Sequence, residues 1–133
     1  MKKTTLKLTL LCAVMAAAGA AFAGDVIVIA NAGVTLSPEE VRDVFVGDKQ
    51  LAGSTKLVPI DNSSAQADFL SKVMKVDAAK YGSIWTKKGF RDGLKTPDTK
   101  GSDAEVIAAV KSTPGAVGYV SKAPGDAKVI AKY

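Results

Sequence analysis

The stretch "GSDAEVIAAVKSTPGAVGYV", residues 101–120, encodes one helix followed directly by one strand. Ser102 and Glu105 stand three residues apart just before an apolar run, which is the pattern of a capping box at a helix N-terminus. Val106 and Val110 then share one face of the predicted helix. The closing segment AVGYV is apolar throughout, which predicts an internal strand whose glycine lets a neighbouring element approach closely. A helix that leads into a buried strand is typical of an α/β domain.

The chain before this stretch shows the same alternation of strands and helices. Residues 25–31, DVIVIAN, are rich in β-branched residues and predict a buried parallel strand. Residues 36–47 predict a helix, because Ser37, Pro38 and Glu40 form a capping box with proline at the first helical position. Residues 56–60, KLVPI, predict a second strand.

The remaining segments complete this pattern. Residues 64–74 predict a second helix, and residues 76–90 predict a third one that is capped by Asp77 and buries Tyr81 and Trp85. We also predict a polar loop over residues 91–101 and a last short strand over residues 127–133. The expected fold is therefore α/β, with a mostly parallel central sheet flanked by about four helices.

The first 23 residues have the features of a secretory signal peptide. They combine a basic start, an apolar run and the small residues AFA before a predicted cleavage after Ala23. Cys12 follows two leucines rather than small residues, which argues against a lipid anchor. Cleavage would leave residues 24–133, one domain of 110 residues with no membrane insertion. We expect this domain in the periplasm.

Composition narrows the chemistry of the domain. Without the three lysines of the leader, the domain has 15 basic and 13 acidic residues. This nearly balanced charge argues against nucleic acid as a partner. The chain has no histidine, and its single cysteine lies in the leader. These residue types carry most zinc sites and most nucleophile–base pairs, so neither a metal site nor a catalytic triad is expected. We expect no cofactor and no enzymatic activity.

The sequence "VPIDNSSAQADF", residues 58–69, contains the candidate binding residues Asn62, Ser63, Ser64 and Gln66. A strand that leads into a helix N-terminus is a potential anion site, because free backbone N–H groups and the positive end of the helix dipole point the same way. Serine is also an ordinary residue for a helix start, so simple capping is an equally direct interpretation.

The order of these motifs resembles the periplasmic phosphate-binding proteins of ABC transporters. The resemblance rests on the pattern L-S-x6-F-x-G over residues 36–47, on residues 58–69, on Trp85 and on residues 101–120. It implies one lobe of a periplasmic-binding-protein-like fold, a small oxyanion as ligand with phosphate first, and a transporter or another periplasmic protein as partner. Family members typically place an arginine three residues after the first serine, where this chain has Gln66. A glutamine forms no charge-assisted pair, so weaker anion binding is expected.

Two functions remain open at this point. The first is a solute-binding-like domain that holds an oxyanion at the start of the second helix. The second is an accessory protein-interaction module that keeps the fold without a ligand. A basic patch at the end of the third helix stabilises that helix terminus or supplies the missing cation; it comprises Lys87, Lys88, Arg91 and Lys95.

Overall fold

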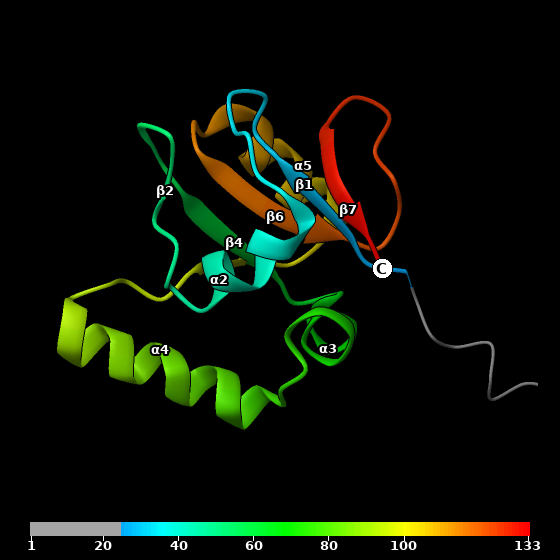
Figure 1. Cartoon of the computed structure of the whole chain (residues 1–133). Coiled ribbons are helices and arrows are strands. Elements are labelled where there is room, and N and C mark those ends of the chain that lie inside the picture. The colour runs from blue at the N-terminus through cyan, green and yellow to red at the C-terminus, as the bar shows by residue number, and fades with distance from the viewer. Residues whose placement is uncertain (1–24) are drawn as a thin grey trace, which may run out of the picture.

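The computed structural model describes residues 25–133, which form one α/β body (Figure 1). The predicted signal peptide and its cleavage after Ala23 lie outside the described residues. In the described part of the chain, no helix is both long and apolar enough to cross a membrane.

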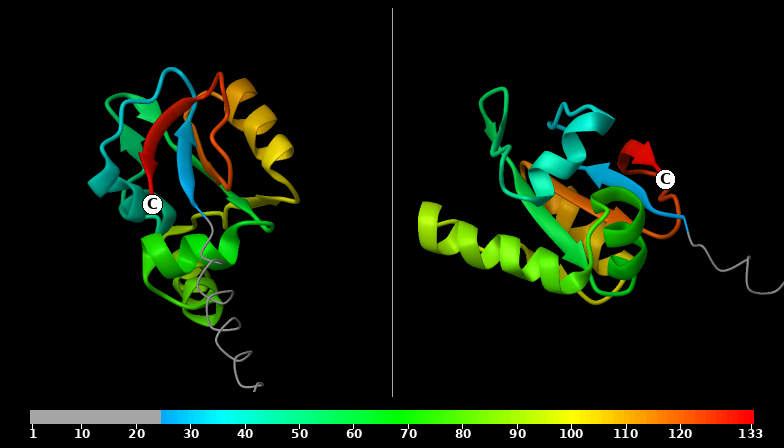
Figure 2. Two further views of the ribbon diagram at one scale, coloured as in Figure 1. Left: turned by 90° about the vertical axis from the view of Figure 1, so that its right-hand side faces the viewer. Right: turned by 60° about the horizontal axis from the view of Figure 1, so that its bottom comes forward.

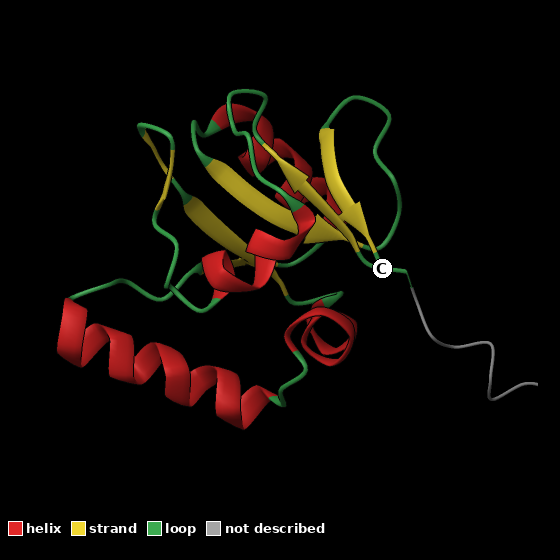
Figure 3. Ribbon diagram, in the orientation of Figure 1, coloured by secondary structure: helices red, strands yellow, loops and turns green. Residues whose placement is uncertain are grey.

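A five-stranded sheet forms the centre of the domain, in the order β5-β4-β6-β1-β7. Its strands are β1 (Ile27–Ala30), β4 (Val58–Asn62), β5 (Asp98–Lys100), β6 (Ala116–Val120) and β7 (Lys128–Lys132). A separate small hairpin joins β2 (Leu51–Ala52) to β3 (Thr55–Lys56). Figure 3 shows this hairpin standing apart from the main sheet.

Strand β1 corrects one prediction. It is buried as expected, but it runs antiparallel to both of its neighbours, β6 and β7. Strand β4 pairs in parallel with β5 and β6. All strands of the sheet except β1 therefore run in one direction, which confirms the mostly parallel sheet. A buried apolar run does not reveal strand direction, because strands covered on both faces look alike in sequence.

The helices cover both faces of the sheet (Figures 1 and 2). They are the 3₁₀ turn η2 (Pro38–Glu40), α2 (Val41–Phe45), α3 (Gln66–Phe69) with its π-helical continuation η3 (Leu70–Met74), α4 (Ala78–Asp92) and α5 (Asp103–Ser112). Helices α2, α3 and α4 pack on one face, where they bury Phe45, Phe69, Tyr81, Trp85 and Tyr119. Helix α5 covers the other face, where Val106 and Val110 contact β-strand residues such as Ile29 and Val120.

The close approach predicted at the glycine of AVGYV is confirmed. Strand β6 is an internal strand, and Gly118 faces helix α5. A Cβ atom added at Gly118 would lie 2.7 Å from Val106 Cγ1 and 3.1 Å from Val110 Cγ2. Because real Cβ atoms essentially never show a contact as short as 2.7 Å, glycine lets the helix sit this close to the sheet.

The caps agree with the sequence at three helix starts. Asp77 accepts a hydrogen bond from the Lys80 N–H at 2.8 Å, and the Glu40 carboxylate accepts one from the Ser37 N–H at 2.9 Å. The Ser102 hydroxyl accepts from the Glu105 N–H at 3.3 Å, but Glu105 bonds the N–H of Gly101 rather than that of Ser102. The second capping box is therefore only half formed.

Two other boundaries differ from the prediction. Helix α3 begins at Gln66, two residues later than expected, because Ser64 is bonded to Asn62 in a turn before the helix. The segment predicted as a polar loop over residues 91–101 contains the short strand β5 at its end. Strand β5 has no apolar side chain, so its sequence carries no strand signal.

Candidate functional site

The Ser63–Ser64 turn follows β4 at the carboxyl edge of the sheet, where open α/β sheets commonly bind ligands. Three consecutive backbone N–H groups of this turn already have acceptors within the protein. Ser63 donates to the Lys100 carbonyl at 2.9 Å, Ser64 to Asn62 Oδ1 at 3.0 Å, and Ala65 to the Asn62 carbonyl at 3.1 Å. The turn therefore does not point these donors at a ligand.

Asn62 is fully buried, and its side-chain amide has no hydrogen-bonding capacity left. Its Nδ2 donates to Asp103 Oδ1 at 2.8 Å and to the Tyr119 carbonyl at 3.0 Å. Its Oδ1 accepts from the Ser64 N–H at 3.0 Å and from the Ser64 hydroxyl at 2.6 Å. A primary amide has two donor hydrogens and two acceptor lone pairs, and all four are used here. The Asn62 amide is thus fully bonded within the protein, and its role as a ligand-binding residue stays a prediction.

The carboxylate of Asp103 links the ends of strands β4 and β6, because it bonds Asn62 and Ser121. Asp103 is the first residue of helix α5, and its Oδ2 accepts hydrogen bonds from the Ser121 N–H at 3.1 Å and the Ser121 hydroxyl at 2.7 Å. Partial burial acts to raise the pKa of Asp103, but the hydrogen bonds from Ser121 and Asn62 hold this pKa below its ordinary value. The chain therefore supplies its own anion where a helix N-terminus attracts one.

A second carboxylate, Asp61, is buried one residue earlier in β4. It accepts hydrogen bonds from the Tyr81 hydroxyl at 2.9 Å and the Tyr119 hydroxyl at 2.8 Å. Burial raises the pKa of Asp61 above its ordinary value, although the two hydroxyl groups act in the opposite direction. The pKa values of Tyr81 and Tyr119 are raised as well, first by burial and then by the charge of Asp61. No ion pair of the described residues includes Asp61.

The other two predicted site residues lie at the surface of this region. Ser63 is exposed, and Gln66 is half-buried at the first position of α3. The structure thus brings all four predicted residues to one edge, but it adds Asp103 and Ser121, which sequence reasoning missed. Their part in this network depends on contacts between segments that are far apart in the chain. We name the set Asp61, Asn62, Ser64, Tyr81, Asp103, Tyr119 and Ser121 the carboxyl-edge network.

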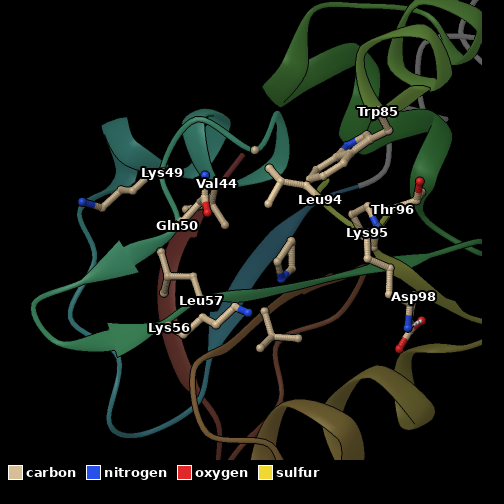
Figure 4. Close-up of a pocket in the computed structure, with 14 residues that line it drawn as sticks. Val44, Lys49, Gln50, Lys56, Leu57, Trp85, Leu94, Lys95, Thr96 and Asp98 are labelled. Atoms are coloured by element: carbon tan, nitrogen blue, oxygen red, sulfur yellow. Dashed lines mark ion pairs between the residues drawn. The ribbon is translucent and has the colours of Figure 1, made fainter. Parts of the chain in front are cut away.

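A pocket lies at the opposite, amino-terminal end of the same strands (Figure 4). It encloses about 230 Å³ and is bordered by the chain that enters β4, by the start of β5, by the end of α2 and by Trp85 of helix α4. Its walls are mostly apolar and include Val44, Leu57, Pro59, Trp85 and Leu94. The sequence indicated burial for Trp85 but gave no sign of a pocket beside it.

Three lysines border this pocket, and they differ in their partners. Lys49 forms an ion pair with Glu40 at 2.9 Å, and Lys95 forms one with Asp98 at 3.3 Å. Within residues 25–133, the Lys56 ammonium has neither a hydrogen bond nor an ion pair. In Figure 4, Lys49 extends away from the pocket, whereas Lys56 lies along β4 among the lining residues. Lys56 is therefore an exposed ammonium with no protein partner, beside an apolar surface. We call this region the Lys56 pocket.

The predicted basic patch is divided between separate interactions. Lys88 pairs with Asp48 at 2.5 Å, across the space between α4 and the loop after α2. Lys95 belongs to the border of the Lys56 pocket. No hydrogen bond or ion pair of the described residues links Lys87, Lys88, Arg91 or Lys95 to the Ser63–Ser64 turn.

Comparison with protein families and with curated proteins finds no match to this sequence. Among solved structures, the chain is similar to an ABC-type phosphate transport receptor from Vibrio cholerae, with a TM-score of 0.49 and 15% sequence identity. The similarity covers 81% of this chain and 46% of the receptor chain, so this chain spans less than half of the receptor's length. The α/β fold itself is established by the sheet order and the helix layers described above.

Proposed function

We propose that the domain is an exported, non-catalytic binding domain for a small anionic solute, and that the Lys56 pocket holds this solute. The observation that carries the proposal is the unpaired ammonium of Lys56 beside an apolar pocket of about 230 Å³. A cation next to a concave apolar surface attracts an anion and provides a place for its apolar part. The resemblance to periplasmic binding proteins supports an anionic solute. The Lys56 ammonium and the apolar lining support the Lys56 pocket as the place where it binds.

Binding rather than catalysis fits the residues that line this pocket. Its polar side chains are lysines, Gln50, Thr96 and Asp98, and the Asp98 carboxylate is paired with Lys95. This set offers charge and hydrogen bonds but no nucleophile with an adjacent base. The buried carboxylate of Asp61 belongs to the carboxyl-edge network at the other end of β4 and does not line the pocket.

A titration followed by tryptophan fluorescence tests the proposal. Trp85 is the only tryptophan of the chain and lines the pocket, so its emission reports occupancy of the pocket. We expect small anions to change this emission in the wild type, and Lys56→Gln to weaken the response about tenfold, as loss of a charge-assisted contact does. Lys122→Gln is the matched control, because Lys122 is exposed and does not line the pocket.

Two other outcomes would contradict the proposal in different ways. Phosphate binding that Lys56→Gln leaves intact and that Ser63→Ala weakens would move the site to the Ser63–Ser64 turn. Absence of any binding at millimolar anion would favour the accessory protein-interaction module. Export has its own test, since intact-mass analysis of periplasmic protein should find a chain that begins at Gly24; a retained leader or a lipid on Cys12 would overturn it.

A further inference from the structure

We infer that the Lys56 pocket is selective for an organic monocarboxylate with one compact apolar group, such as a single ring or a short branched chain, over an inorganic oxyanion. This inference rests on the proposed function, because it names the chemical class of the solute for the same pocket. Three features carry it: the size of the pocket, the nature of its walls and the number of charges available to a ligand.

The size of the pocket fits one ring or one branched chain. The pocket encloses about 230 Å³. An apolar cavity of about 150 Å³ accepts benzene, so the present volume accommodates a ring with a short arm. It is smaller than the pockets of about 300–1,000 Å³ that hold drug-sized ligands. A bare phosphate or sulfate ion would leave most of this apolar surface without contact.

The walls offer apolar contact and few hydrogen bonds. The Trp85 indole N–H is already bonded to the Phe45 carbonyl at 3.0 Å, so the indole presents only its carbon surface to a ligand. Leu57 is 5% exposed, and Pro59 and Leu94 are half-buried, which makes a continuous apolar wall with the indole. An inorganic oxyanion needs several donors around its oxygens, and its desolvation against such a wall would remain uncompensated.

The wall packs closely over Gly47. This residue has φ +81°, and a Cβ atom added to it would lie 3.1 Å from Trp85 Cη2 and 3.3 Å from Leu94 Cδ1. The indole and the leucine therefore pack over Gly47 with little room for a side chain at that position. A pocket that is already formed binds an apolar group without the cost of ordering its walls.

The charge at the pocket matches a single carboxylate. Lys49 and Lys95 each have a carboxylate of the protein that offsets part of their charge, whereas the Lys56 ammonium has no protein partner. One ammonium neutralises one carboxylate, whereas a doubly charged phosphate would need a second cation released from its ion pair. The carboxylate would lie at Lys56 and the hydrocarbon against Trp85 and Leu57.

The experiment compares four ligands with the full mature domain: 3-phenylpropanoate, its neutral amide, acetate and inorganic phosphate. Isothermal titration and Trp85 fluorescence are measured with the wild type, Lys56→Gln, Lys56→Arg and the control Lys122→Gln. We expect 3-phenylpropanoate to bind at least about tenfold more tightly than its amide or acetate, since a lost ion pair or ring each costs about 1.4 kcal/mol or more. Lys56→Gln should remove the preference for the acid over the amide, while Lys56→Arg and Lys122→Gln should retain it.

Each remaining outcome has a defined meaning. If phosphate binds in a manner that depends on Lys56 and 3-phenylpropanoate does not, the monocarboxylate inference is wrong and the proposed function of the pocket stands. If the amide binds as tightly as the acid, the role of Lys56 is wrong. If none of the four ligands binds at millimolar concentration to a wild type with an unchanged melting curve, the inference and the proposed function both fail.

Discussion

The two ends of strand β4 differ in how far their polar groups are already satisfied. At the carboxyl end, Asn62 bonds to Asp103, to Ser64 and to the Tyr119 carbonyl. Both amide hydrogens and both oxygen lone pairs of Asn62 are therefore used. At the amino end, the Lys56 ammonium has no partner among residues 25–133, and an apolar pocket lies beside it. Ligands of open α/β sheets commonly bind at the carboxyl ends of strands. In this chain, the lysine without a protein partner lies at the opposite end.

This difference shows that a position in a fold does not make a binding site. The carboxyl edge has the expected strand, turn and helix start. However, side chains of the domain itself form the hydrogen bonds there that a ligand would otherwise form. A network of this kind stabilises the native state, because each buried donor finds an acceptor. The Lys56 pocket differs from this network, because its apolar surface and its ammonium have no partner within the free protein. Binding regions often sacrifice stability in this way.

The largest expected effect tests the structural role of Asn62. Asn62→Ala would leave the Ser64 N–H, the Tyr119 carbonyl and the Asp103 carboxylate without their shared partner. We expect the free energy of unfolding to fall by about 3 kcal/mol, as for other losses in buried hydrogen-bond networks. Urea denaturation measures this change. Ser63→Ala is the neighbouring control and should change stability by less than about 0.5 kcal/mol, because the Ser63 side chain is exposed. Equal effects of the two substitutions would refute the assignment of Asn62 as the centre of the network.

The next prediction concerns the buried carboxylate of Asp61. Burial raises its pKa in the folded state, so the folded protein binds this proton more tightly than the unfolded chain. Stability from this group is therefore present at acidic pH and is lost as pH rises from the ordinary aspartate pKa of about 3.9 through the folded pKa. Asp61→Asn should remove this loss, so the variant should gain stability relative to the wild type as pH rises above the ordinary aspartate pKa. Urea midpoints across this range measure it. Wild-type and variant curves that stay parallel would show that Asp61 titrates normally.

A smaller effect is expected at the cap of helix α5, which begins beside Asp103. Ser102→Ala removes the hydroxyl that accepts from the Glu105 N–H, and we expect a loss of about 1 kcal/mol in thermal or urea unfolding. Ser37→Ala is the comparison at the other predicted box. There the Glu40 carboxylate also accepts from the Ser37 backbone N–H, a bond that the substitution keeps, so the loss should be smaller. A larger loss at Ser37 than at Ser102 would contradict this ranking.

The sequence predicted most of the fold because its main signals are local. Capping patterns at Ser37 and Asp77 and the apolar run of β6 depend on neighbouring residues, and each is found where it was expected. The direction of β1 and the existence of β5 depend on pairing with distant strands, which leaves no local pattern.

The candidate site was harder to predict for the same reason. The four predicted residues lie together at one edge of the sheet, but the bonding of Asn62 depends on Asp103, 41 residues further along the chain, which itself bonds Ser121. The Lys56 pocket has no motif at all. Its walls come from α2, β4, α4 and the segment before β5, which only the folded chain brings together.

The smallest expected effect concerns Gln66, which stands where the resembling phosphate-binding proteins carry an arginine. If the turn were an anion site that lacks only its cation, Gln66→Arg would tighten phosphate binding at least about tenfold. We expect no such gain, because the N–H groups of Ser63, Ser64 and Ala65 remain bonded within the protein and an added guanidinium does not release them. The Asp103 carboxylate, hydrogen-bonded to Asn62, adds a repulsive charge to this edge. Calorimetry with millimolar phosphate at low ionic strength should therefore give the same heat for the wild type and the variant. Lys56→Gln in the same background separates the two ends of the strand: phosphate binding that appears with Gln66→Arg and survives Lys56→Gln would restore the carboxyl edge as the binding site.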